Sequence, residues 1–223
     1  MPFLVIAGLS VITVIPVLAA IAAAPDFPAS EEKRIFGIFY VAPVLMSLGF
    51  VMGVADGSAF SLTALFGVLS GLSQEAAITC LTAFLVGGIA FQYPMGWLAD
   101  KYDRRSIGTA LALGSIAIAA LLPFALPNPC ITWFLFGLIG IPIIGLYAIA
   151  LGIVGDRFQG AEMGAANAFF VMSFEFGALS GAPLSGFAME LVGPNGLLLV
   201  IATSGAIVAA GFKLRGNRWQ KDT

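Results

Sequence analysis

Residues 96–105 read Gly-Trp-Leu-Ala-Asp-Lys-Tyr-Asp-Arg-Arg, and the rest of the chain can be interpreted around them. Five of these ten residues are charged, in a sequence of which only 10% of the residues are charged. Two long apolar segments, 75–99 and 106–126, meet at this run. Each is long enough to cross about 30 Å of hydrocarbon as a helix that rises about 1.5 Å per residue. The stretch therefore predicts a charged hairpin between two membrane-spanning helices.

The composition indicates an all-α polytopic membrane protein. Sixty per cent of the residues are hydrophobic and the mean hydropathy is +1.02, more apolar surface than a soluble domain can bury. The apolar runs are continuous, whereas a membrane β-barrel alternates polar and apolar positions. There is no histidine, and Cys80 and Cys130 lie fifty residues apart without a metal-binding pattern. We therefore expect no metal, no cofactor and no enzymatic activity, since no nucleophile elbow is present either.

Seven spans can be counted along the chain. They are expected at 3–24, 35–66, 75–99, 106–126, 130–154, 162–190 and 197–212. Pro142 is expected to kink the fifth. The first has no basic start and is too long for a signal peptide, so we expect a true span, with the last helix of a longer protein as the alternative.

The basic residues predict the orientation. Seven spans place four segments on one side of the membrane: 25–34, 100–105, 155–161 and the tail after 212. These segments hold every basic residue of the sequence: Lys33, Arg34, Lys101, Arg104, Arg105, Arg157, Lys213, Arg215, Arg218 and Lys221. Because basic loops stay in the cytoplasm, we expect a cytoplasmic C-terminus and an external N-terminus.

The charged hairpin fits the pattern Gly-x-Leu-Ala-Asp-[Arg/Lys]-x-x-Arg-[Arg/Lys]. This pattern resembles the signature loop of the major facilitator superfamily, which joins the second and third helices of a six-helix half. Gly96 would allow close helix approach, and Asp100 could accept from a helix N-terminus or an arginine. Arg104 and Arg105 could pair with acids or anionic headgroups. Together with Lys101, these residues form the expected gating motif.

A second resemblance covers much of the remaining chain. Segments 147–150, 156–157, 162–168 and 177–186 resemble the tenth and eleventh helices of the YcaD-like bacterial branch of that superfamily, and 42–43 and 91–96 fit the same branch. The resemblance implies the sixth to twelfth helices of a facilitator. The expected domains are a first helix at 1–24 that ends the missing half, a cytoplasmic linker at 25–34, a six-helix half at 35–212 and a cytoplasmic tail at 213–223.

The resemblance implies a secondary active transporter in the bacterial inner membrane, which moves a small solute by alternating access between two halves. It does not identify the substrate. Because most of one half is missing, the expected partner is a second half-transporter chain or a second copy in a homodimer, unless the chain is a fragment. A non-transporting scaffold or partner-binding subunit is the alternative function. A stable monomer in mild detergent without solute-dependent stabilisation would count against transport.

Two carboxylates are expected within spans. Glu175 lies near the middle of its expected helix and Asp56 towards the outer end of its own. Burial in hydrocarbon favours the neutral form of an acid, which suits a reversible proton carrier, and a cationic substrate is the other functional interpretation. Either acid could instead bond to a neighbouring helix, and Asp56 could lie at the outer interface. Gln92 and Tyr147 rank next as residues that line a translocation path or join helices.

Overall fold

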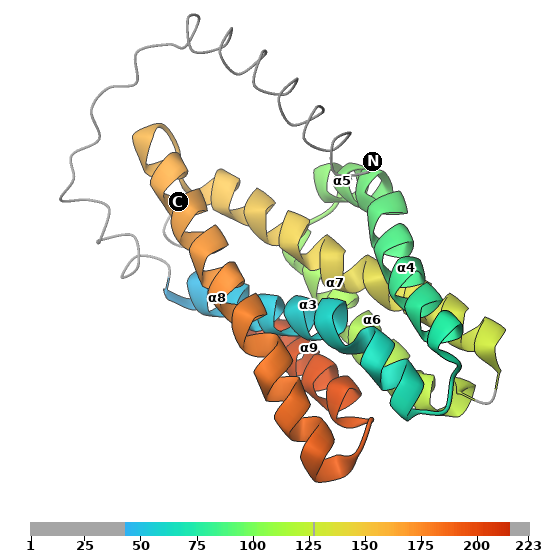
Figure 1. Ribbon diagram of the computed structural model, residues 1–223. Coiled ribbons are helices and arrows are strands. Elements are labelled where there is room, and N and C mark those ends of the chain that lie inside the picture. Colours follow the sequence, from blue (N-terminus) through green and yellow to red (C-terminus); the bar gives the residue numbers. More distant parts are fainter. Residues whose placement is uncertain (1–42, 127, 215–223) are drawn as a thin grey trace, which may run out of the picture. The chain divides into compact units, whose positions relative to one another are not determined.

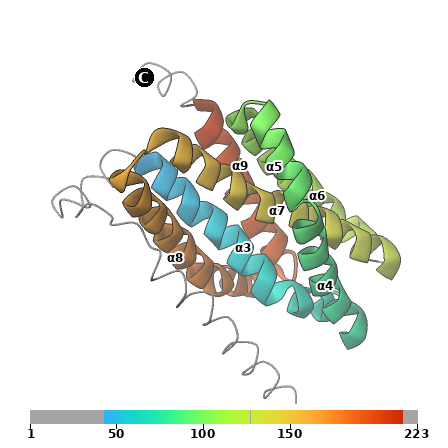
Figure 2. The ribbon, with the colours of Figure 1, turned by 90° about the horizontal axis from the view of Figure 1, so that it is seen from above.

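The computed structural model describes residues 43–126 and 128–214, and within these ranges every regular element is an α-helix. Figure 1 shows them packed as a bundle, seen from above in Figure 2. The elements are α3 (Pro43–Leu69), α4 (Gln74–Ala90), α5 (Gln92–Lys101), α6 (Arg104–Ala125), α7 (Pro129–Arg157), α8 (Ala161–Val192) and α9 (Gly196–Leu214).

Six candidate membrane spans are present in the described part of the chain, with α4 and α5 together forming one of them. This confirms the all-α polytopic class and the six expected spans that fall within the described residues. The expected first span, 3–24, the linker at 25–34 and the start of the second span at 35–42 lie outside the described residues. Most of the expected tail, 215–223, does so too, while α9 extends to Leu214.

The span expected as one helix over 75–99 is two helices, and that expectation was wrong. The α4 helix ends at Ala90, and Phe91 separates it from α5. Pro94 is the physical reason, because proline has no N–H to donate to the Ala90 carbonyl and its ring crowds that carbonyl. Pro142 behaves differently, since α7 continues through it without ending.

Glycines set the closest helix contacts. On α3, a Cβ at Gly53 would meet the Phe174 carbonyl, and one at Gly57 would meet the backbone of Ala178, so the two helix backbones touch. Gly177 and Gly181 of α8 lie equally close to the α3 backbone. The residue numbers of the contact partners rise together on both helices, from Gly53 with Phe174 to Gly57 with Ala178, so α3 and α8 run parallel. The glycines at 177 and 181 are therefore packing surfaces, as small residues commonly are between membrane helices.

One end of the bundle carries every basic residue in the described ranges. Lys101, Arg104 and Arg105 lie at the α5–α6 turn, Arg157 ends α7 and Lys213 lies in the last turn of α9. Contacts join these termini: Arg104 pairs with the end of α7, and Phe212 packs on Gly108 near the start of α6. We refer to this end, which also holds the start of α3, as the basic end.

Candidate functional site

Three of the predicted site residues meet on three different helices. Glu175 of α8 lies within electrostatic range of both Asp56 of α3 and Tyr147 of α7. The Tyr147 ring packs against Phe174, with 4.7 Å between ring centroids, and against Phe170 at 6.0 Å. We call Asp56, Tyr147 and Glu175 the acid face. Its members are far apart in sequence and are brought together by the packing of α3, α7 and α8.

Asp56 lies on α3, thirteen residues before the helix ends at Leu69, and it is partly buried. The helix extends three residues beyond the expected end at 66. The expected place of Asp56 towards the outer end of its span stays a prediction, because the start of that span lies outside the described residues.

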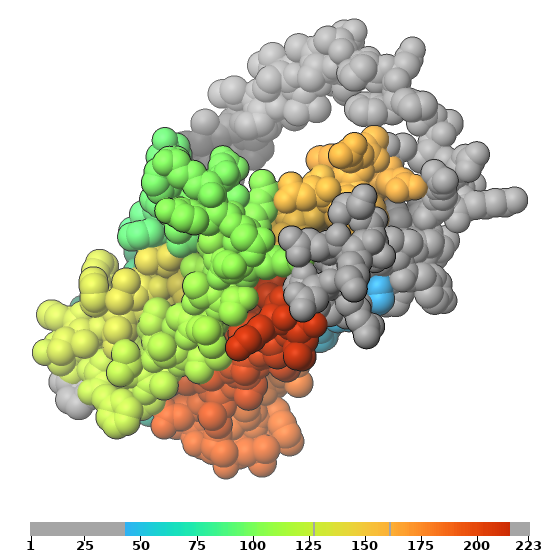
Figure 3. All heavy atoms as spheres, turned by 180° about the vertical axis from the view of Figure 1, so that it is seen from behind, coloured from blue at the N-terminus to red at the C-terminus, as the bar shows by residue number. Residues whose placement is uncertain are grey.

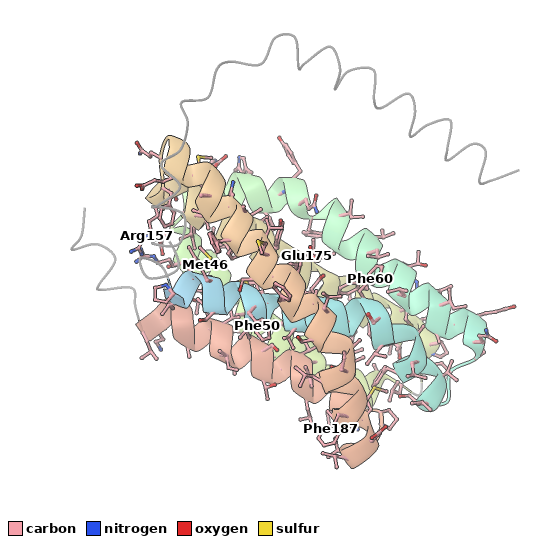
Figure 4. The ribbon with its side chains drawn as sticks, turned by 60° about the vertical axis from the view of Figure 1, so that its left-hand side comes forward. Met46, Phe50, Phe60, Arg157, Glu175 and Phe187 are labelled. Atoms are coloured by element: carbon pink, nitrogen blue, oxygen red, sulfur yellow. The ribbon has the colours of Figure 1, made fainter. Side chains whose placement is uncertain are left out.

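Glu175 lies on the surface of the described bundle, about half-way along α8 (Figure 4). Its neighbours on the same exposed stripe are apolar: Met172, Phe176 and Leu179 are 54%, 60% and 73% exposed. A charged side chain at the centre of a bilayer costs roughly 2.5–3.5 kcal/mol on insertion scales. This face of α8 is thus poorly suited to lipid and better suited to water or to another protein surface.

Two serine hydroxyls join α8 to α3. The Ser173 hydroxyl donates to the Met46 carbonyl at 2.7 Å. The single proton of the Ser58 hydroxyl is shared between the Val54 carbonyl of its own helix at 2.6 Å and the Gly181 carbonyl of α8 at 2.9 Å. Such bonds between membrane helices contribute about 1 kcal/mol or less each. They help to set the register of α8 on α3, in which Glu175 lies within electrostatic range of Asp56. Sequence reasoning missed both serines, because a single hydroxyl in an apolar helix gives no indication of its partner.

Gln92 does not join the acid face. It is the first residue of α5 and is exposed, and α5 packs mainly on α7, α6 and α4. The structure thus brings together three of the four residues predicted as proton or substrate contacts.

The charged hairpin is held by Arg104. Its guanidinium lies 3.8 Å from Asp100, one turn earlier, and 3.5 Å from Asp156 near the end of α7. It occupies the space over Gly152, where a Cβ would collide with it. Ion pairs at these distances with both acids mostly exposed contribute about 1 kcal/mol or less. The pairs therefore position the hairpin against α7 more than they stabilise the fold.

Two other members of the motif differ in their surroundings. A Cβ at Gly96 would meet nothing within 4 Å, so no helix of the described ranges approaches closely at Gly96, and the expected close approach stays a prediction. The reason is that this face of α5 points away from the bundle and Gly96 is exposed. Lys101 places its ammonium 3.9 Å from the centre of the Trp97 ring, a cation–π contact.

Asp103 begins α6 as its N-cap. Its carboxylate accepts hydrogen bonds from the Ser106 N–H and the Ser106 hydroxyl, both at 2.9 Å. Partial burial acts to raise the pKa of Asp103, but these hydrogen bonds and the nearby Arg105 charge outweigh it and lower the pKa below the ordinary value of 3.8. The ionised form is therefore the one that caps the helix.

Asp103→Ala is expected to lower the free energy of unfolding by about 1 kcal/mol, since it removes an N-cap. The pKa of Asp103 is lower in the folded protein than its ordinary value of 3.8. The cap therefore contributes its full share of the free energy of unfolding above that ordinary value, and this share is lost as the pH falls through the pKa of the folded protein. Unfolding in detergent at pH 7 and at progressively lower pH measures this. The neighbouring Asp100→Ala, which removes no cap, is the control, and an equal loss in both variants would contradict the capping role.

The comparisons with known proteins agree with this architecture. Six apolar spans define a multi-pass integral membrane protein. The chain matches the Major Facilitator Superfamily over residues 45–220, so it belongs to this family, whose members are transporters and not enzymes.

Similar proteins include the Uncharacterized MFS-type transporter YfkF of Bacillus subtilis, 26% identical over 74% of this chain and 41% of YfkF. The Uncharacterized MFS-type transporter YcaD of Salmonella paratyphi B is 27% identical over 69% of this chain and 39% of YcaD. The chain thus aligns with about two fifths of the length of these relatives. An auto inhibited POT family peptide transporter shares the fold, with a TM-score of 0.67, 20% identity, and coverage of 79% of this chain and 37% of that structure.

Proposed function

We propose that this chain forms half of a secondary active transporter that moves a small solute across the membrane by alternating access, with the acid face lining the path. The observation that carries the proposal is Glu175, an exposed carboxylate half-way along α8 and the one charged residue between Glu162 and Glu190, within electrostatic range of Asp56 and Tyr147. Facilitators bind substrate between their two halves near the bilayer midplane. The acid face lies at about that depth on three of the six spans.

The acid face suits a cation. The described spans contain no basic residue at the depth of Asp56 and Glu175, so neither carboxylate faces a fixed positive charge there. Two carboxylates at such a site can hold a proton or a cationic group between them and exchange one for the other. The aromatic rings of Tyr147, Phe170 and Phe174 add faces on which an organic cation could rest. Proton coupling through Glu175 is the mechanism that we propose.

A second six-helix half would complete the site. Supporting this, the chain covers about two fifths of its relatives, and Glu175 and Gly96 are both exposed on the described bundle. We propose that 35–212 is the second half of the facilitator and 1–24 the last helix of the first. The missing part would come from a separate chain, from a second copy, or from the rest of a longer chain of which this sequence is a part. The hairpin at 96–105 would then act as a latch on the other half, on the cytoplasmic side of a bacterial inner membrane.

Glu175→Gln is expected to abolish proton-linked transport, because an amide keeps the shape of the side chain but cannot carry a proton. Vesicles of the producing cells' own membranes, which retain any partner chain, are loaded with the pH dye pyranine and exposed to a panel of small organic cations. The unmodified protein should change the internal pH on addition of a transported solute. The variant should lose at least nine tenths of this signal.

Glu190→Gln, the same substitution near the C-terminal end of α8, is the matched control and should retain the signal. Equal amounts of each variant in the membrane are verified by immunoblot. Unaltered proton-linked transport in Glu175→Gln would refute the proposed proton carrier.

A further inference from the structure

A groove between α6 and α9 opens at the basic end, away from the acid face. It has a volume of about 670 Å³. Its lining consists of Asp103, Arg105, Ser106, Thr109, Ala110, Leu113, Ala209, Ala210, Phe212 and Lys213. Figure 3 shows this side of the molecule, with α6 in yellow-green beside α9 in red. Arg105 belongs to the gating motif, but the other nine lining residues belong neither to that motif nor to the acid face.

Small residues create the groove. Phe212 lies directly on Gly108, where a Cβ would meet its ring, so the two helices touch at this point. They touch again further along, where Gly205 lies against Ser115. Beside these contacts, alanines at 110, 209 and 210 fill too little of the space between the helices. The result is an open channel along the helix pair.

The lining changes character along the groove. Arg105, Ser106, Thr109 and Lys213 supply cations and hydroxyls at the mouth. From Arg105 to Leu113 the helix advances eight residues, about 12 Å, towards the centre of the span. Over that length the lining becomes alanine and leucine. A charged mouth that leads into an apolar channel matches a molecule with an anionic head and a hydrocarbon chain.

The charge at the mouth favours an anion. Arg105 and Lys213 carry two positive charges, and Asp103 carries one negative charge that accepts two hydrogen bonds from Ser106. The formal sum is +1. The adjoining sequence 215–223 is itself basic, with Arg215, Arg218 and Lys221 against Asp222, so its charge does not complement this mouth. The charge of an anionic phospholipid does complement this mouth.

We propose that the α6–α9 groove is a binding site for an anionic phospholipid. The headgroup phosphate lies between Arg105 and Lys213, and one acyl chain follows Ala110 and Leu113 towards the bilayer centre. Each Lys or Arg near an anionic membrane surface contributes about 1 kcal/mol of attraction, or about fivefold in affinity. The two cations together should therefore favour an anionic over a zwitterionic lipid by about 25-fold.

Native mass spectrometry of the full chain in detergent tests this site. Phosphatidylglycerol and phosphatidylcholine with identical acyl chains are titrated separately, and phosphatidylglycerol should bind at least tenfold more tightly. The double variant Arg105→Gln and Lys213→Gln should lose about 25-fold in phosphatidylglycerol affinity. Lys101→Gln, which removes a cation of the basic end outside the groove, should change it less than twofold.

Two further variants test the acyl-chain contact separately from the headgroup contact and control for misfolding. Ala110→Trp fills the channel without a change of charge and should also weaken the binding of phosphatidylglycerol. The exchange Arg105→Lys with Lys213→Arg keeps both cations and should retain binding. Equal binding of the two lipids, equal loss in Lys101→Gln, full binding in Ala110→Trp, or displacement of the lipid by millimolar glycerol phosphate would each overturn the proposal.

Discussion

Gly53→Ala is expected to destabilise the bundle by at least about 2 kcal/mol, although alanine is preferred over glycine in an ordinary helix by about 1 kcal/mol. The new Cβ would meet the Phe174 carbonyl and, at 2.8–2.9 Å, the Phe174 carbonyl carbon and the Ala178 nitrogen. These are backbone atoms, which cannot rotate away as a flexible side chain could. The α3 and α8 helices would have to separate, and the Ser58 and Ser173 hydrogen bonds would lengthen.

Gly114→Ala on α6 is the matched control. A Cβ at Gly114 meets nothing within 4 Å, so the intrinsic preference for alanine should raise stability there. The measurement is the unfolding midpoint of both purified variants in the same detergent, together with the monodisperse fraction in size-exclusion chromatography. Gly53→Ala should lower the unfolding midpoint and Gly114→Ala should raise it. A Gly53→Ala protein as stable as Gly114→Ala would contradict the close α3–α8 contact.

The spans could be predicted from the sequence because they depend on local properties. Apolar length and the charged run at 96–105 placed the described spans close to their observed bounds, except for the start of the span at 35–66, which lies outside the described residues. The break at Phe91 was also predictable in principle, since Pro94 lies inside the expected helix. It was missed because hydropathy continues across the break and proline is tolerated in membrane helices, as the unbroken α7 at Pro142 illustrates.

The candidate site could be predicted only as separate residues. Glu175, Asp56 and Tyr147 stand out individually as polar groups in apolar spans, but their proximity depends on the parallel crossing of α3 and α8. That crossing results from glycine contacts between residues more than a hundred positions apart. The partner of Arg104 was missed for the same reason: Asp156 was recognised only as part of a motif, and its approach requires Gly152 beneath the guanidinium.

The central claim is that the exposed stripe of α8 beside Glu175 lines a water-accessible path. Cysteine accessibility tests it most directly, in a background with Cys80→Ala and Cys130→Ser. Phe176→Cys reports on that stripe, and Leu113→Cys on α6 is the control, because these positions are 60% and 55% exposed and each lies near the centre of its helix. Fractional exposure is therefore matched, and only the surroundings of the two positions differ.

The measurement is the rate at which a membrane-impermeant maleimide labels each cysteine in intact membranes of the producing cells. We expect Phe176→Cys to react at least tenfold faster than Leu113→Cys, because a thiol must be hydrated to ionise and react. Solutes that are transported should slow the labelling at position 176 alone. Equal and negligible labelling at both positions would mean that the Glu175 face of α8 is not open to water, and would contradict the account.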